Sequence, residues 1–109
     1  MIINPDTRVL VVDDTPKNLR ETTNFARRIG YKVVDTATNN IDALSKLKYQ
    51  TYGLIISDNA LLLENTLDIP CILRTTKLEY KLNVINSSVH KYIITPFSEE
   101  TLKHTIEEI

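Results

Sequence analysis

Two short apolar runs, each ended by aspartate, constrain this chain more than any other feature. Residues 9–12 are followed by Asp13 and Asp14, and residues 54–57 are followed by Asp58. Apolar, β-branched runs of this length are typical of strands buried in a parallel sheet. If the two strands are neighbours, three carboxylates meet at one sheet edge, where a cation or a proton must offset their repulsion. The runs therefore predict a site for a hard divalent metal, Mg²⁺, with Asp58 available as a nucleophile.

Short apolar runs and amphipathic stretches alternate along the chain. Strands are expected at residues 8–12, 31–37, 54–58, 69–73 and 91–94. Helical spacing follows each strand except the third. Strands that alternate with helices predict an α/β domain, with a parallel sheet covered on both faces through right-handed crossovers. We expect residues 1–109 to form a single domain.

The helices are predicted from their caps and their apolar stripes. The first follows Thr15, has Pro16 at its first position and ends at Gly30. The second begins at Asn39–Asn40, and Ser98 caps the last. The expected inner residues are Leu19, Thr23, Ala26 and Ile29, then Ile41, Leu44 and Leu47, then Leu78, Leu82 and Ile85, and finally Leu102, Ile106 and Ile109.

The connection after Asp58 is unusually short. Only residues 59–69 lead to the next strand, whereas a parallel crossover takes about a dozen residues or more, including its helix. We therefore expect the third helix of the fold to be reduced or replaced by a loop. The thinly covered sheet face would then favour a protein partner or a homodimer.

Composition excludes several classes of function. A net charge of −1 gives no electrostatic footprint for nucleic acid or for an anionic membrane, and no apolar stretch approaches a membrane span. Two glycines form no phosphate-cradling loop, and the isolated His90 and His104 form no zinc pattern with one cysteine. Cys71 is predicted to be a buried small hydrophobe in a reducing compartment. Because the first residues lack the form of a signal peptide, we expect a cytoplasmic protein.

The motifs, taken in order, resemble the receiver domains of two-component response regulators. The likeness rests on RVLVVDD at residues 8–14, LIISD at 54–58, the run from Ile69-Pro70 to Thr75, and YIITPF at 92–97. Each motif is weak alone, but together they span nearly the whole chain and are fairly specific. The resemblance implies a flavodoxin-like, doubly wound sheet of five parallel strands in the order 2-1-3-4-5. The site would lie at the carboxyl ends of the strands.

The resemblance also implies roles for individual residues. Asp58 would accept a phosphoryl group from the phosphohistidine of a histidine kinase or a phosphotransfer protein. Asp14 and Asp58, with the main-chain carbonyl of Ala60, would bind Mg²⁺, and Asp13 would act mainly through a water. Thr75 would donate its hydroxyl to the phosphoryl group.

By the same likeness, the response would pass to another protein. Tyr92 would turn inward when Thr75 moves. The helix at 78–85, the strand at 91–94 and the last helix would face a downstream target or a fused output domain. Such a chain would at most catalyse its own phosphorylation from a phosphodonor, and it would not be an enzyme that turns over a small substrate.

The main departure from the family concerns a cation. Receivers have a lysine where Thr95 stands, and its loss would weaken the phosphorylated state or the switch about ten- to a hundredfold. Lys91 lies about 13 Å back along its strand, and Lys77 is the other lysine near this edge. Arg74 occupies a position suited to an apolar residue, so it either points to solvent or pairs with an acid. The peptide bond before Pro96 fits a cis bond.

Three functions stay open at this point. The first is a receiver that binds metal and accepts phosphate, with altered switching. The second is a pseudo-receiver, kept for phosphorylation-independent protein contacts or for dimerisation. Thr95 and the short crossover favour the second, whereas the retained acids favour the first. The third is a metal-dependent phosphohydrolase with Asp13 as nucleophile, which would want a second acid where Thr15 stands.

Overall fold

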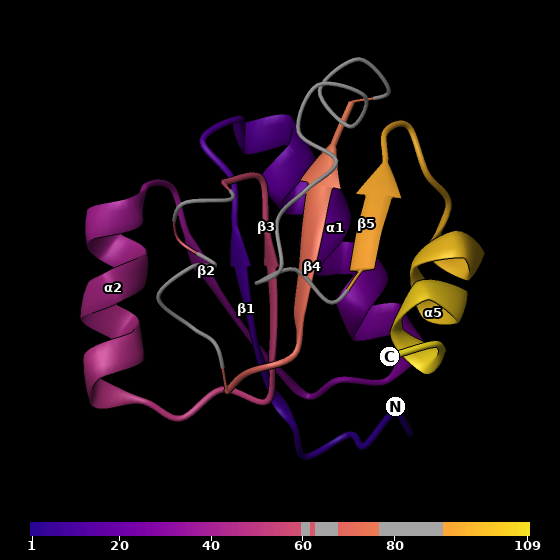
Figure 1. Ribbon diagram of the computed structural model, residues 1–109, viewed down its shortest axis with the longest axis horizontal. Helices are drawn as coiled ribbons and strands as arrows, with labels where there is room; N and C mark the ends of the chain where they lie inside the picture. The colour runs from indigo at the N-terminus through magenta and orange to yellow at the C-terminus, as the bar shows by residue number, and fades with distance from the viewer. Residues whose placement is uncertain (60–61, 63–67, 77–90) are drawn as a thin grey trace.

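The strands of this protein form one sheet whose order matches the prediction (Figure 1). The computed structural model describes residues 1–59, 62, 68–76 and 91–109. The strands are β1 (Arg8–Val12), β2 (Val33–Ala37), β3 (Leu54–Ser57), β4 (Cys71–Thr75) and β5 (Lys91–Ile94). The described helices are α1 (Pro16–Ile29), α2 (Asn40–Tyr49) and α5 (Glu99–Glu107). All neighbouring strands are parallel, in the order β2-β1-β3-β4-β5.

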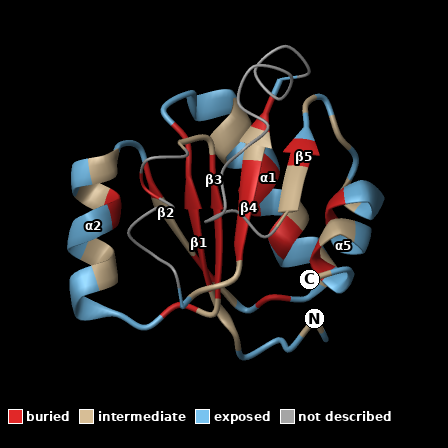
Figure 2. Cartoon of the chain, in the orientation of Figure 1, coloured by how far each residue is buried: buried red, intermediate tan, exposed pale blue. Residues whose placement is uncertain are grey.

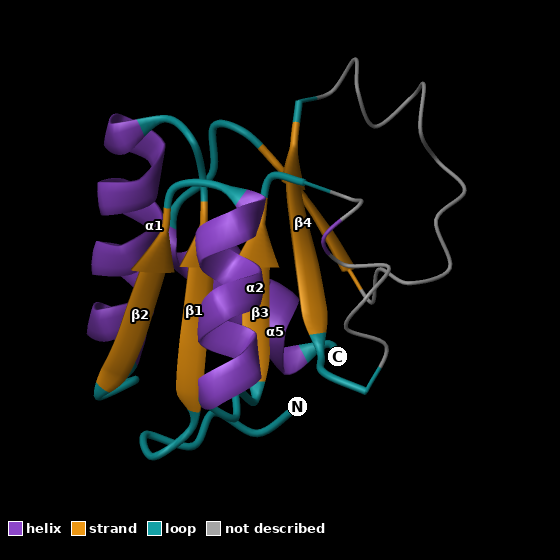
Figure 3. Ribbon diagram, turned by 90° about the vertical axis from the view of Figure 1, so that its left-hand side faces the viewer, coloured by secondary structure: helices purple, strands orange, loops and turns teal. Residues whose placement is uncertain are grey.

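Alternating side chains along the strands build two cores, one on each face of the sheet. α1 and α5 cover one face and α2 covers the other (Figures 1 and 3). Buried residues facing α1 and α5 include Val9, Val11, Leu54, Ile56, Ile72 and Ile93. Those facing α2 include Leu10, Val12, Ile55, Cys71 and Leu73. Because both faces are covered, the central strands are buried along most of their length (Figure 2), which explains their unbroken apolar runs.

Local signals set the ends of α1 and α5. Thr15 occupies the N-cap position before Pro16, and Gly30 ends α1 with a φ of 131°, a conformation that favours glycine. At the start of α5, the side chain of Ser98 accepts a hydrogen bond from the amide of Thr101. The predicted inner residues that pack in the core between these helices and the sheet are Leu19, Ala26, Ile29, Leu102, Ile106 and Ile109.

The predicted inner stripe of α2 is wrong in two of its three residues. Ile41 is 83% exposed and Leu44 is 46% exposed, whereas Ala43 is fully buried and Leu47 packs in the same core. At about 100° per residue, Ile41 and Leu47 lie about 120° apart around the helix, so they do not share one face. Ala43 and Leu47 are one turn apart, and the sheet packs against this pair instead.

Two predicted helical features fall outside the described residues. The helix expected at 78–85 is one, and most of the connection expected to replace the third helix is the other. Within that connection, Leu62 is helical, 1% exposed and part of the core facing α2. Two smaller predictions are confirmed, since Cys71 is fully buried and the Thr95–Pro96 peptide bond is cis.

Candidate functional site

The carboxyl ends of β1 and β3 lie side by side and bring the three predicted aspartates together. Val12 is in register with Ser57, and the amide of Asp58 donates to the carbonyl of Val12 at 3.2 Å. One carboxylate oxygen from each of Asp13, Asp14 and Asp58 lies within 4.8 Å of the others. The predicted convergence of the three acids is therefore confirmed.

The three carboxylates differ in their exposure and their contacts. Asp13 is 1% exposed, Asp58 is partly buried and Asp14 is exposed. The amide of Thr15 donates to Asp13 Oδ1 at 2.9 Å, and its hydroxyl donates to Asp14 Oδ1 at 3.3 Å. Asp13 thus holds the turn from β1 into α1, while Asp14 and Asp58 keep access to solvent.

Crowding makes the Asp58 carboxyl group hard to ionise. Burial, followed by the charge of Asp13, raises the pKa of Asp58 to about 6. A hydrogen bond from the Asp14 amide to Asp58 Oδ2, 3.4 Å long, acts in the other direction and lowers this pKa. Asp58 is therefore mainly ionised at neutral pH, and a cation in the pocket would favour the ionised form further.

Arg74 enters this pocket from β4. Its Nη1 lies 3.2 Å from Asp13 Oδ2, and its side chain is 14% exposed. The contact is an ion pair without hydrogen-bond alignment, because no described residue donates a hydrogen bond to the buried Oδ2 atom. Of the two alternatives predicted for Arg74, pairing with an acid is confirmed. The sequence did not identify Asp13 as the partner, and the only signal was a charged residue in an apolar strand.

The other predicted residues lie on β4 and β5. Thr75 ends β4 and is 6% exposed, and the amide of Thr95 donates to its carbonyl at 2.9 Å. Thr75 and Thr95 thus stand at the same carboxyl edge of the sheet as the acids. Tyr92 lies further back in β5, partly buried against the core facing α2. Ala60 and Lys77 lie outside the described residues.

A hollow of about 480 Å³ adjoins the acidic pocket. Its lining residues are Val12, Asp14, Thr38, Asn39, Asn40, Ile41, Asp58 and Asn59. The loop from β2 to α2 therefore supplies one wall, which the sequence did not predict. In the sequence Asn39 marked only a helix start, and its side chain does accept the amide of Asp42 at 2.8 Å. The hollow gives an incoming group access to Asp58.

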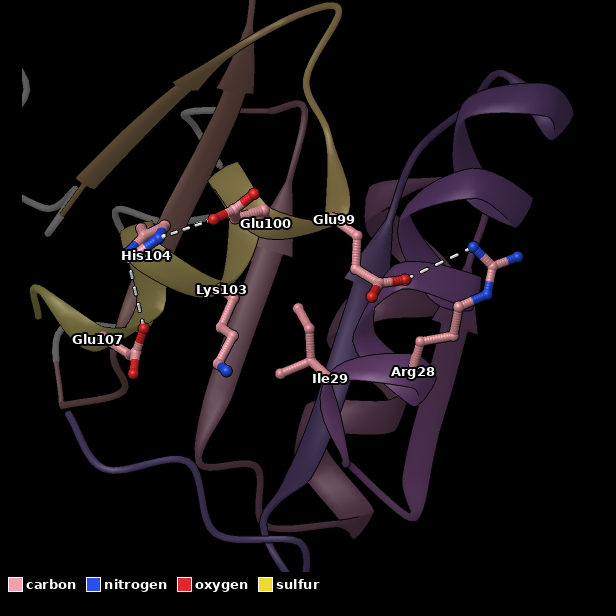
Figure 4. Close-up of a pocket in the computed structure, with 7 residues that line it drawn as sticks. All are labelled: Arg28, Ile29, Glu99, Glu100, Lys103, His104 and Glu107. Atoms are coloured by element: carbon pink, nitrogen blue, oxygen red, sulfur yellow. Dashed lines mark hydrogen bonds and ion pairs between the residues drawn. The ribbon is translucent and has the colours of Figure 1, made fainter.

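A second hollow, of about 400 Å³, lies between the last turn of α1 and α5 (Figure 4). Several of its polar side chains contact one another: Arg28 lies 3.5 Å from Glu99, and the His104 ring lies 3.5 Å from Glu100 and 3.8 Å from Glu107. The acidic pocket adjoins the first turn of α1 instead. The described side chains of the second hollow have mixed charge and form no convergent set of metal ligands, so the acidic pocket is the candidate site.

Comparison with known proteins agrees with this fold and pocket. The sequence profile of the response regulator receiver domain matches residues 9–107. Chemotaxis protein CheY-3 of Vibrio cholerae is 25% identical, over 99% of this chain and 95% of that protein. The structure of the chemotaxis response regulator CheY4 of Vibrio cholerae has a TM-score of 0.83 at 22% identity, covering 94% of this chain and 98% of that one. Response regulator TrrA of Thermotoga maritima, in complex with Mg²⁺ and BeF, has a TM-score of 0.80 at 25% identity, covering 94% and 97%.

The chain therefore belongs to the receiver domain family of response regulators. It is a CheY-like receiver of two-component signal transduction. Receiver domains interact with histidine kinases and downstream targets, and they bind Mg²⁺ through an acidic aspartate cluster. None of the described helices has the length and apolarity that a membrane span requires. The cytoplasmic location expected from the sequence stays a prediction.

The acidic pocket fits Mg²⁺ by the chemistry of its donors. Its side-chain ligands are carboxylate oxygens, which hard divalent cations prefer. Asp13 Oδ2 is also a buried acceptor without a hydrogen bond from any described residue. Arg74 Nη1 lies 3.2 Å from this oxygen without hydrogen-bond alignment, so the oxygen can still accept a hydrogen bond from a metal-bound water.

Proposed function

We propose that this receiver accepts a phosphoryl group on Asp58, with Mg²⁺ in the acidic pocket. The donor is the phosphohistidine of a histidine kinase or a phosphotransfer protein. The observation that carries the proposal is the convergence of three carboxylates within 4.8 Å, with Asp58 also lining an open hollow. A purely structural role does not explain three neighbouring carboxylates, because like charges at this distance destabilise the folded protein unless a cation or a proton compensates them.

The transfer is a nucleophilic displacement at phosphorus. A carboxylate oxygen of Asp58 forms a bond to phosphorus while the bond from phosphorus to the imidazole nitrogen breaks. The electron pair of the broken bond stays on the histidine, and the product is an aspartyl phosphate. Because the pKa of Asp58 is about 6, its nucleophilic carboxylate form predominates at neutral pH. When bound by Asp14, Asp58 and the carbonyl of Ala60, Mg²⁺ supplies positive charge to the phosphoryl oxygens.

The signal then passes through the end of β4 and through β5. Thr75 donates its hydroxyl to the phosphoryl group, and Tyr92 is the aromatic residue that responds on β5. A downstream protein reads the face that includes β5 and α5. Thr95, where receivers have a lysine, makes this switch atypical. The buried position of Thr75 at the carboxyl edge supports its role.

The two alternatives to a phosphoaccepting receiver are a pseudo-receiver and a metal-dependent phosphohydrolase. Thr95 favours a pseudo-receiver that acts through protein contacts or dimerisation without phosphate. The phosphohydrolase alternative is disfavoured, because Asp13 is 1% exposed and its two oxygens face the Thr15 amide and Arg74. A nucleophile needs an accessible oxygen.

The deciding experiment is direct phosphorylation. The protein is incubated with Mg²⁺ and a small phosphodonor, and intact mass is measured with and without Asp58→Asn. The matched control is Asp6→Asn, which removes an acid that is 82% exposed and lies before the start of β1. We expect one added phosphoryl group in the wild type and in the control, and none in Asp58→Asn. No addition to the wild type, even with a cognate kinase, would favour the pseudo-receiver.

A further inference from the structure

The acidic pocket of this receiver already contains a cation. Among the described residues, Arg74 is the only basic residue that forms an ion pair with Asp13, Asp14 or Asp58. The position at which receivers carry a lysine holds Thr95. Relative to the usual receiver pattern, the pocket therefore lacks a positive charge at the end of β5 and has a positive charge on β4 instead.

Strand order places these two positions on the same side of the acids. Arg74 follows Ile72 by two residues on β4, so both lie on the sheet face covered by α1 and α5. Arg74 is also in register with Ile93 on β5, two residues before Thr95. Since β4 lies between β3 and β5, the strand that carries Arg74 is one strand nearer to Asp58 than the strand that leads to Thr95.

Burying the guanidinium group of Arg74 costs desolvation free energy unless its charge is paired. A largely buried guanidinium group must be paired, and an apolar residue at this place in a buried strand would avoid the desolvation penalty. Arginine stays charged at every ordinary pH. Its contact with Asp13 is made by Nη1, so Nη2 and Nε retain three N–H donors.

We propose that Arg74 binds the phosphoryl group and supplies, from β4, the positive charge missing at Thr95. The inference rests on the proposed phosphorylation of Asp58. Arg74 reduces the charge of the acid cluster from three negative charges to two. The pocket then binds Mg²⁺ less tightly than three unpaired acids would. The remaining guanidinium donors hold the phosphoryl oxygens once Asp58 is modified.

Arg74→Met tests this role because its two expected effects have opposite signs. Mg²⁺ affinity, measured by calorimetry on the unphosphorylated protein, should rise about five- to tenfold when the repelling charge is removed. The lifetime of the phosphorylated state should fall about ten- to a hundredfold, because hydrogen bonds to charged groups are lost. Simple structural damage would lower both quantities.

Two further variants make the test specific. Arg8→Met removes a comparable ion pair, with Asp35 at 3.3 Å, at the other end of β1 and should change neither quantity. Arg74→Val with Thr95→Lys returns the cation to the position usual in receivers. This double variant should regain a phosphorylated lifetime close to that of the wild type.

The possible results separate the proposed role of Arg74 from the proposed phosphorylation of Asp58. If Arg74→Met changes neither quantity, or lowers both while the protein stays folded, the role of Arg74 is refuted. Should Arg74→Met fail to fold, Arg74→Gln removes the charge but keeps a polar side chain beside Asp13. That variant should show the same rise in Mg²⁺ affinity and the same fall in phosphorylated lifetime, and an unchanged lifetime overturns the inference. If the wild type accepts no phosphate, the proposed function fails, and the Mg²⁺ titration alone decides the role of Arg74.

Discussion

Replacing Asp58 by asparagine should stabilise the metal-free protein above neutral pH. The pKa of Asp58 is about 6 in the folded state and close to about 3.9 in an unfolded chain. Between these values, the folded state holds a proton that the unfolded state has released. Stability of the wild type therefore falls as pH rises from about 4 to 6 and stays lower above that range.

The magnitude follows from the size of the shift. Two pKa units correspond to about 3 kcal/mol as an upper limit. Asp58 is only partly buried, and solvent screening reduces the expected penalty to about 1 kcal/mol. For a domain of this size, about 1 kcal/mol corresponds to a rise of roughly 4 °C in Tm. Asparagine cannot ionise, so its advantage should be absent at pH 4 and complete at pH 7.

Thermal unfolding in EDTA at several pH values measures this difference, with Asp6→Asn as the control. Saturating Mg²⁺ should then reverse the order, because only the wild type retains Asp58 as a ligand. A concentration one hundred times Kd stabilises the bound state by about 2.7 kcal/mol. If Asp58→Asn is no more stable than the wild type at pH 8 in EDTA, the electrostatic account of the pocket is wrong.

Three further predictions concern the scaffold. Ser98→Ala should cost about 1 kcal/mol in urea unfolding, because the Thr101 amide loses its cap; an unchanged midpoint would mean that the cap does not stabilise α5. A Cβ at Gly53 would lie 2.6 Å from Thr7 Cγ2, so Gly53→Ala should cost about 1–3 kcal/mol. Adding Thr7→Ser should restore most of that loss, and no restoration would contradict the contact. Ile41→Gln should stay within about 0.5 kcal/mol of the wild type, since the residue is 83% exposed; a larger loss would contradict the outward face of α2.

The proposed role of Arg74 concerns the position of the positive charge in the acidic pocket. The loss of lysine at Thr95 alone predicts a weak phosphorylated state. If Arg74 acts as proposed, this expectation changes, because its ion pair with Asp13 places a positive charge in the same pocket from the neighbouring strand. The double variant with Thr95→Lys therefore measures whether the two positions are interchangeable.

The sequence alone determined the sheet and the meeting of the acids. Unbroken apolar runs can be buried only in a sheet covered on both faces, and parallel strands place Asp13, Asp14 and Asp58 at one edge. The ends of α1 and α5 were also predictable, because capping by Gly30 and Ser98 is local chemistry.

Only the tertiary structure decided the inner face of α2 and the partner of Arg74. The apolar residues of α2 occupy more than one face, so packing against the sheet had to select Ala43 and expose Ile41. The charge of Arg74 required some acid, yet its own strand offered none. The partner, Asp13, follows β1, and β3 separates β1 from β4 in the sheet. A long side chain reaches across that distance only once the strands are assembled, so no local pattern could name the pair.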